Sequence, residues 1–194
     1  MNIVHELVQR GLLRFPPSGT SFPGREGRPK RYVIDTRGAG ADPELRGLIV
    51  DRLAEIATMG EAFDVIAGVA KSGTCWAAWL AWKNRVPFAN ILLDGARGTG
   101  LQRDVEGEVA GMRVLLIDNW ARSGSSLIRA AEIAARAGAV TVGALTITRN
   151  EVIALGFPHR VAWELGELLE AAADAGLHLP LSDSAPVTPN PHAI

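Results

Sequence analysis

Hydrophobic positions along the chain change repeatedly between short unbroken runs and longer segments with helical spacing. The short apolar runs predict buried strands, and apolar residues at intervals of three and four predict helices. The predicted strands are residues 32–34, 63–70, 88–93, 114–117 and 141–148. The predicted helices are residues 3–13, 43–59, 75–83 and 127–137. Because strands alternate with helices, we expect an α/β fold: a Rossmann-like, mostly parallel sheet flanked by helices on both faces.

Segments rich in proline, glycine and serine separate or follow these elements. Residues 15–30 and 36–43 predict loops and turns, with Asp42 placed as an N-cap before Pro43. Residues 181–194 are rich in Pro and Ser, so we expect a flexible tail there. The remaining residues, 1–180, are long enough for a single well-filled domain.

Composition and charge narrow the range of partners. A formal net charge of -1 with 47% hydrophobic residues is typical of a globular protein without a basic surface for nucleic acid. No apolar run approaches the roughly 20 residues of a membrane span. The single cysteine, Cys75, cannot form an internal disulfide, and the first residues lack a secretory pattern. We therefore expect a cytoplasmic protein that binds small molecules or a second copy of itself, with no nucleic acid and no membrane.

The most informative segment is residues 114–126, VLLIDNWARSGSS. A buried strand is predicted to end at Ile117, and the next apolar-periodic segment predicts a helix closed by Gly138. The backbone N–H groups of residues 123–126 would then lie at a helix N-terminus, which favours an anion. Asp118 and Asn119 would follow the strand, where acceptors suit sugar hydroxyls. The same pattern is also compatible with an ordinary turn, since strand, loop and helix recur in every α/β protein.

The segment lacks two better-known phosphate motifs. The Gly-Lys-Ser/Thr ending of a Walker loop is missing, and no G-x-G-x-x-G follows a strand. The four histidines have no metal-ligand spacing, so we expect no metal site built from the chain alone.

The segment VLLIDNWARSGSS resembles the phosphoribosyl diphosphate (PRPP) signature of type I phosphoribosyltransferases. Two further segments, RYVIDTRGAGADPELRGLIVDRLAEI and FDVIAGVAKSGTCWAAWLA, are similar to orotate phosphoribosyltransferases. The resemblance runs from about Leu7 to about Asn150. It implies the type I fold with a small N-terminal hood, and a transferase that moves ribose 5-phosphate from PRPP to a nitrogenous base. It also implies Mg²⁺ held mainly through PRPP, and a homodimer.

The resemblance also implies roles for particular residues. The 5′-phosphate would be held by Arg122, Ser123, Gly124, Ser125 and Ser126. The ribose hydroxyls would face Asp118 and Asn119. The pyrophosphate loop would be Lys71, Ser72, Gly73 and Thr74. On the base side, Arg149 matches an arginine that orotate enzymes use for the pyrimidine, and Arg28 and Lys30 are further candidate ligands.

This sequence departs from the family pattern in two places. Asn119 stands where the signature has its second acidic residue, which keeps an acceptor but loses a charge. The lid positions that carry cations in orotate enzymes are neutral here: Leu92, Leu93, Ala96 and Gly98. Arg97 and Arg103 are the candidate catalytic replacements, since arginine binds diphosphate well.

Two hypotheses therefore stand. The first is a pentosyltransferase enzyme of the orotate phosphoribosyltransferase type, whose base is orotate or another pyrimidine or purine. The second is a non-catalytic regulatory protein that keeps a PRPP or nucleotide pocket. Trp120, beside the acidic position, is compatible with covering the ribose or with a dimer contact.

Overall fold

The structure is a computed structural model that describes residues 3–17, 20–23, 29–95, 103–177 and 188–189. The chain divides into two compact units. The larger unit is Arg46–Leu165, and the smaller one combines Met1–Leu45 with Gly166–Ile194. The smaller unit thus takes residues from both ends of the chain, not from the N-terminus alone. The predicted single domain of residues 1–180 stays a prediction.

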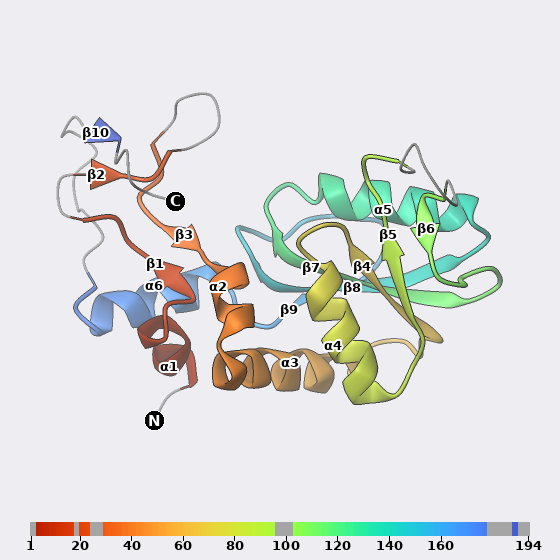
Figure 1. The fold of residues 1–194 in the computed structure, drawn as a ribbon, viewed down its shortest axis with the longest axis horizontal. Helices are drawn as coiled ribbons and strands as arrows, with labels where there is room; N and C mark the ends of the chain where they lie inside the picture. Colours follow the sequence, from red (N-terminus) through yellow and green to blue (C-terminus); the bar gives the residue numbers. More distant parts are fainter. Residues whose placement is uncertain (1–2, 18–19, 24–28, 96–102, 178–187, 190–194) are drawn as a thin grey trace. The chain divides into compact units, whose positions relative to one another are not determined.

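The larger unit is built on a six-stranded sheet with the order β6-β5-β4-β7-β8-β9 (Figure 1). Its strands are β4 (Val65–Val69), β5 (Phe88–Ile91), β6 (Val105–Glu106), β7 (Arg113–Ala121), β8 (Val140–Arg149) and β9 (His159–Val161). Among the strands that the structure describes in this sheet, β6 is antiparallel to β5 and every other pair is parallel. The predicted mostly parallel α/β sheet is confirmed.

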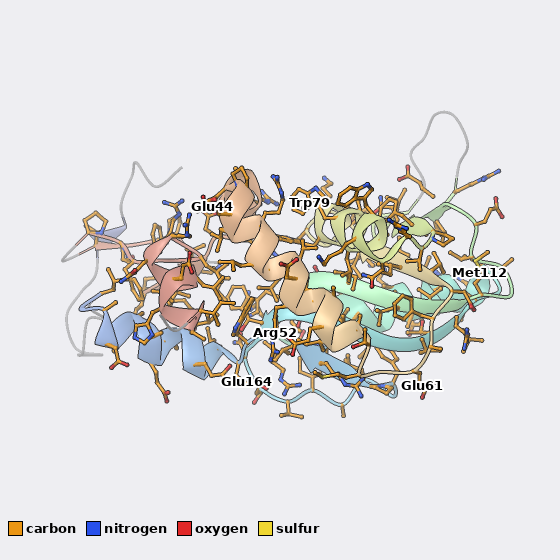
Figure 2. All side chains as sticks on the ribbon, turned by 90° about the horizontal axis from the view of Figure 1, so that it is seen from below. Glu44, Arg52, Glu61, Trp79, Met112 and Glu164 are labelled. Atoms are coloured by element: carbon orange, nitrogen blue, oxygen red, sulfur yellow. The ribbon has the colours of Figure 1, made fainter. Side chains whose placement is uncertain are left out.

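Three helices connect or precede these strands: α3 (Pro43–Ala57), α4 (Thr74–Asn84) and α5 (Ser125–Arg136). Because α4 leads from β4 to β5 and α5 leads from β7 to β8, the two crossovers run in opposite directions along the sheet. Right-handed crossovers then require the two helices to cover opposite faces, as Figure 1 shows. Figure 2 places Trp79 on α4 and Met112 just before β7.

The central strands are hydrophobic throughout because both of their faces are covered. All five residues of β4 are buried, as are Val114 to Asp118 in β7. On α5, the buried positions Leu127, Ala130, Ile133 and Ala134 repeat at helical spacing. Gly138 follows this helix with a φ of +82°, a conformation that glycine adopts without strain, so the predicted helix end is confirmed.

In its described residues, the smaller unit holds three helices and four two-residue strands. They are α1 (Ile3–Gln9), β1 (Leu13–Arg14), β2 (Thr20–Ser21), β3 (Val33–Ile34), α2 (Thr36–Ala41), α6 (Leu165–Asp174, from its second residue on) and β10 (Thr188–Pro189). β1 pairs with β3, and β2 pairs with β10. Of the predicted flexible tail, the structure describes only Thr188 and Pro189, which form this pairing; the rest lies outside the described residues.

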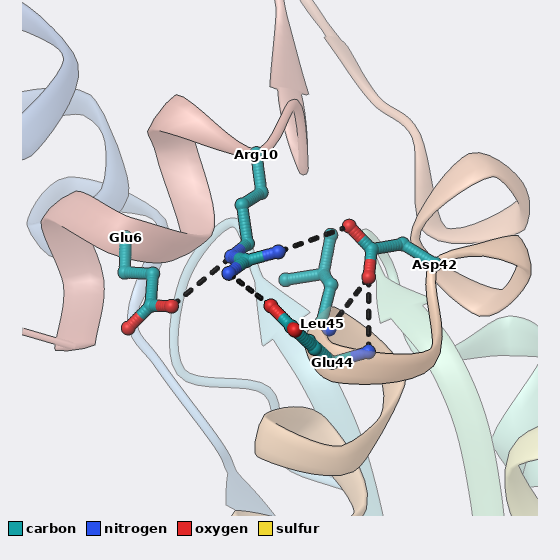
Figure 3. A network of polar contacts seen from close by, with 5 residues as sticks. All are labelled: Glu6, Arg10, Asp42, Glu44 and Leu45. Carbon is teal, nitrogen blue, oxygen red and sulfur yellow. Dashed lines mark hydrogen bonds and ion pairs between the residues drawn. The ribbon is translucent and has the colours of Figure 1, made fainter.

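Arg10 links α1 to the start of α3 within this unit (Figure 3). Its guanidinium donates to Glu6 Oε1 at 3.0 Å and to Asp42 Oδ2 at 3.4 Å, and it also pairs with Glu44. The other Asp42 oxygen accepts the backbone N–H groups of Glu44 and Leu45, at 2.9 and 3.2 Å. These backbone hydrogen bonds and Arg10 lower the pKa of Asp42. The predicted N-cap before Pro43 is confirmed.

Several boundaries differ from the sequence-based expectation. Residues 36–41 form helix α2 where only turns were expected, because the Asp35 carboxylate accepts the Gly38 N–H at 2.8 Å and caps the helix. Residues 20–21 form a short strand inside a segment expected to be irregular. Strand β7 does not end at Ile117 but continues to Ala121, since Asp118, Trp120 and Ala121 remain in register with β8.

In the part of the chain that the structure describes, no helix is both long and apolar enough to span a bilayer.

Replacing Leu116 by Ala tests how much the central strand contributes to stability. Leu116 is fully buried in β7, so Leu116→Ala leaves a cavity and is expected to lower the free energy of unfolding by about 2–5 kcal/mol in urea titrations. The control, Val140→Ala, changes a side chain that is 63% exposed and is expected to stay within about 0.5 kcal/mol of the wild type. Equal losses in both variants would contradict this picture of the core.

Candidate active site

The strand order of the sheet places the candidate site between β4 and β7. These two strands are neighbours and parallel, yet the connections that leave them diverge toward β5 and β8. Where crossovers diverge, the loops at the carboxyl ends of the strands open a crevice, and ligands of open α/β sheets bind there. The loop of residues 70–73 follows β4 and leads into α4, and the loop of residues 122–124 follows β7 and leads into α5.

The first loop lies directly against the backbone of β7. A Cβ atom at Gly73 would stand 2.1 Å from the Ile117 carbonyl oxygen, so no other residue fits without moving the loop. Gly68 in β4 is similarly close, because a Cβ there would lie 2.7 Å from the Thr74 Cα. The Gly73 N–H donates to the Val69 carbonyl at 2.8 Å, and helix α4 begins at Thr74. Lys71 and Ser72 are therefore held beside the end of β7.

A side-chain hydrogen bond joins the two loops. Ser72 Oγ donates to Asp118 Oδ1 at 2.8 Å, and the Asn119 N–H donates to the same oxygen at 2.8 Å. Asp118 is only 6% exposed, and burial raises its pKa although both hydrogen bonds act to lower it. Within the described ranges of the chain, no cation lies within ion-pair distance of this carboxylate. Asp118 is thus a buried hydrogen-bond acceptor without a cationic partner among the described residues.

The second loop leads directly into the N-terminus of helix α5, which begins at Ser125. Gly124 has a φ of +75°, and a Cβ at this position would lie 2.5 Å from a Leu155 methyl group. Glycine thus lets the chain turn sharply into α5, whose first N–H groups have no partner within the helix. Ser123 Oγ donates to Ser125 Oγ at 3.1 Å, and both side chains are exposed.

Trp120 is held beside this loop by two contacts. Its Nε1 donates to Asn150 Oδ1 at 2.6 Å, and the Arg122 guanidinium lies 5.6 Å from the centre of its ring. Asn119 Oδ1 accepts the Trp120 N–H at 2.7 Å. The two sequence-based alternatives for Trp120, a ribose cover or a dimer contact, both remain open.

A cavity of about 600 Å³ opens beside the first loop. It is lined by Ala70, Lys71, Thr74, Asn90, Leu92, Leu93, Asp94 and Gly95. Thr74 Oγ1 donates to Asn90 Oδ1 at 2.7 Å, and Asn90 Nδ2 donates to Glu106 Oε2 at 3.0 Å, so this wall is fixed by a polar chain that the sequence did not reveal. Lys71 is the one cation among these lining residues.

Other candidate residues are placed elsewhere or not described. Arg103 lines a separate cavity of about 410 Å³ together with Glu108 and Arg136. Lys30 belongs to the smaller unit, where its backbone forms an isolated antiparallel β-bridge with Phe22. Arg28 and Arg97 lie outside the described residues.

Arg149 ends β8 directly beside Ala121, the last residue of β7. Its Nε donates to Glu164 Oε2 at 3.1 Å, and a second guanidinium nitrogen donates to Glu164 Oε1. Nearby, His159 Nε2 lies 3.0 Å from Thr146 Oγ1, and burial together with Arg149 lowers the His159 pKa to about 4. His159 is therefore neutral at neutral pH. The Glu164 partner was not foreseen, because nothing in the sequence signals a pair 15 residues apart.

No group of three or more His, Cys, Asp or Glu residues is arranged to hold a metal ion in the parts of the chain described.

Comparison with known proteins identifies the family of this chain. The sequence profile of the phosphoribosyl transferase domain matches residues 42–152, more than half of the chain. The chain belongs to the phosphoribosyltransferase family. The matched segment contains both loops, the cavity beside Lys71 and Arg149, whereas Arg28 and Lys30 precede it. The predicted family is confirmed.

Individual relatives agree with this membership. The orotate phosphoribosyltransferase of Pyrobaculum calidifontis is 31% identical over 147 residues, which cover 75% of this chain and 73% of the relative. The crystal structure of orotate phosphoribosyltransferase from Aeropyrum pernix superposes with a TM-score of 0.69 at 21% identity, covering 88% of this chain and 99% of that one. The Mycobacterium tuberculosis orotate enzyme, in a structure described as a complex with PRPP, gives a TM-score of 0.64 at 22% identity and covers 86% of this chain and 99% of its own. The predicted type I phosphoribosyltransferase fold is confirmed.

Adding a methyl group at Gly73 tests the contact between the loop and β7. Gly73→Ala is expected to lower the free energy of unfolding by about 1–3 kcal/mol, because the loop or the strand must move. Gly47 in α3 is the matched control, since nothing lies within 4 Å of an added Cβ there, and Gly47→Ala is expected to stabilise the helix by about 0.5–1 kcal/mol. Denaturant titration of both variants distinguishes a steric effect from a general effect of alanine.

The buried carboxylate makes stability depend on pH. Because burial raises the pKa of Asp118 above its ordinary value of 3.8, the folded protein binds this proton more tightly than the unfolded chain. The contribution of Asp118 to the free energy of unfolding is therefore largest at low pH, and it falls as the pH rises through the folded-state pKa of Asp118. The side chain of the Asp118→Asn variant does not ionise, so the variant does not lose this stability as the pH rises. The Tm of the variant minus the Tm of the wild type is therefore expected to be larger at pH 7 than at about pH 4. A Tm difference that does not change with pH would contradict the assignment.

Proposed function

We propose that this chain transfers ribose 5-phosphate from PRPP to a nitrogenous base and releases pyrophosphate. The observation that carries the proposal is the bond between Ser72 and Asp118, which joins the loops that follow β4 and β7 into one site. A substrate with phosphate groups at both ends of a ribose needs two anion-binding loops on either side of a hydroxyl acceptor. The segments of residues 71–74 and 122–126, together with Asp118, would supply that arrangement.

Each part of PRPP has a counterpart in the chain. The 5′-phosphate would accept hydrogen bonds from the backbone N–H groups at the start of α5, where the helix dipole also favours negative charge. The ribose hydroxyls would donate to Asp118, a buried carboxylate with hydrogen-bond donors but no counter-charge among the described residues. The pyrophosphate would lie over residues 71–74, beside the 600 Å³ cavity that Lys71 lines.

The residues present suit Mg²⁺ that arrives with PRPP better than a metal held by the protein. Asp118 and Ser72 offer oxygen atoms, which Mg²⁺ prefers, but the described residues form no cage of carboxylates or histidines. When bound, Mg²⁺ would neutralise the charge that develops on the leaving pyrophosphate.

The chain itself would act mainly by positioning and by charge. Departure of pyrophosphate leaves positive charge on the ribose, and a fixed carboxylate at Asp118 stabilises that charge more than it stabilises the bound substrate. Lys71 would balance the negative charge on the leaving group. Asn119 contributes no charge, and Leu92 and Leu93 add two uncharged residues to the cavity wall. Arg97 and Arg103 remain candidates for a lid cation.

A homodimer and a cytoplasmic location belong to the same proposal. Trp82 on α4 is 83% exposed and Phe88 at the start of β5 is 38% exposed, and large apolar side chains left exposed in one chain support contacts with a second copy. A cytoplasmic location is supported by the phosphorylated substrate.

Turnover tests the proposal. Purified protein with PRPP, Mg²⁺ and a panel of bases is expected to release pyrophosphate, and Asp118→Asn is expected to lower kcat/KM by about 10²- to 10³-fold, since it removes a charge used in the transition state. The control Asp51→Asn alters an exposed carboxylate that pairs with Lys83 and is expected to leave kcat/KM unchanged.

The non-catalytic alternative gives a different result. Calorimetric binding of PRPP or a nucleotide without pyrophosphate release on any base would contradict the enzyme and identify a regulatory protein instead.

A further inference from the structure

The guanidinium of Arg149 is already occupied by a carboxylate of the same chain. Nε and a second nitrogen of Arg149 donate to the two oxygens of Glu164, and the Arg149 side chain is only 14% exposed. Glu164, labelled in Figure 2, is more accessible, at 45%. An arginine binds a carboxylate through two parallel N–H groups. Glu164 fills one such edge of Arg149 and cancels its charge.

This pair lies next to the proposed ribose-phosphate site. Arg149 is the sheet neighbour of Ala121, which directly precedes the phosphate loop, and the Asn150 N–H donates to the Ala121 carbonyl at 3.1 Å. Asn150 in turn accepts the Trp120 indole N–H. All these residues belong to the larger unit. A base attached to a ribose held by Asp118 would therefore lie near the end of β8.

The charges around this pair do not favour an acidic base. Arg149 and Glu164 sum to zero, and His159, whose Nε2 contacts Thr146, adds no positive charge at neutral pH because its pKa is lowered to about 4. A carboxylate on the base would have to displace Glu164 or lie beside it, and like charges in a partly buried place repel strongly. A neutral base meets no such cost.

We propose that Glu164 sets the base specificity of this enzyme by neutralising Arg149, so that the acceptor is a nucleobase without a carboxylate. The inference rests on the proposed function, and it narrows the substrate class from any nitrogenous base to neutral ones. Glu164 acts in two ways: it cancels the positive charge that would attract an acidic base, and its two oxygens occupy the guanidinium N–H groups that such a base would need.

Two nucleotides that differ only by a carboxylate test this. Uridine 5′-monophosphate and orotidine 5′-monophosphate carry the same ribose phosphate, so the ratio of their dissociation constants, measured by calorimetry, isolates the effect of the carboxylate. The wild type is expected to bind the orotidine nucleotide no more tightly than the uridine one. Glu164→Gln keeps the shape of the side chain but removes its charge, and it is expected to shift the ratio toward the orotidine nucleotide by about tenfold or more.

Three further variants separate specificity from a structural role. Glu164→Asp keeps the charge and is expected to keep the wild-type ratio. Glu132→Gln alters an exposed carboxylate on α5 and is expected to change nothing. In the double variant Arg149→Gln/Glu164→Gln, the gain for the orotidine nucleotide is expected to disappear, because that gain requires the freed guanidinium.

The outcomes for this inference and for the proposed function are distinct. A wild type that binds the orotidine nucleotide about tenfold more tightly overturns the inference, whatever the variants do. An unchanged ratio in folded Glu164→Gln overturns it as well. In both cases pyrophosphate release by the wild type from PRPP and a base leaves the proposed function standing, whereas a wild type that binds neither PRPP nor either nucleotide overturns both.

Discussion

The close approach of two backbones, at Gly73 and the Ile117 carbonyl, is the constraint on which the site depends. The loop after β4 reaches the end of β7 only because residue 73 has no Cβ, which would otherwise lie 2.1 Å from that oxygen. This approach brings Ser72 within hydrogen-bond distance of Asp118. Two segments 46 residues apart in sequence thereby form one polar surface at the carboxyl edge of the sheet.

The charged side chains of Asp118 and Arg149, near the carboxyl edge of the sheet, differ in whether an opposite charge of the chain pairs with them. Asp118 has hydrogen-bond donors but no cation among the described residues, so burial raises its pKa. Arg149, by contrast, is paired through two nitrogens with Glu164. An uncompensated buried carboxylate costs stability until a ligand meets it, whereas a compensated arginine has little electrostatic attraction left for an anion. This difference in charge compensation is the basis for proposing hydroxyl groups as ligands of Asp118 and a neutral group near Arg149.

Several residues that depart from the family pattern lie in described parts of the structure. Leu92 and Leu93 line the cavity beside Lys71, so their apolar side chains form part of its wall. Asn119 uses its amide oxygen for the Trp120 backbone, which orders the last residues of β7. Under the proposed function, Leu92 and Leu93 leave the pyrophosphate side with fewer charges than the family pattern has, and Glu164 neutralises Arg149 on the base side. The segment of residues 114–126 keeps the first acidic residue, Asp118, and the small loop after it.

The sequence by itself determined the order of the main strands and helices, the mostly parallel sheet and the two loops. These follow from local information: apolar periodicity, glycine positions and the Asp42 cap before Pro43. It did not predict helix α2, strand β9 or the extension of β7 to Ala121. The first depends on the Asp35 carboxylate folding back to Gly38, and the other two on hydrogen bonds to β8 that come from far along the chain. Only the tertiary structure decided that Ser72 meets Asp118 and that Glu164 occupies Arg149. Both are contacts between side chains distant in sequence, whose meeting depends on how the sheet brings its strand ends together.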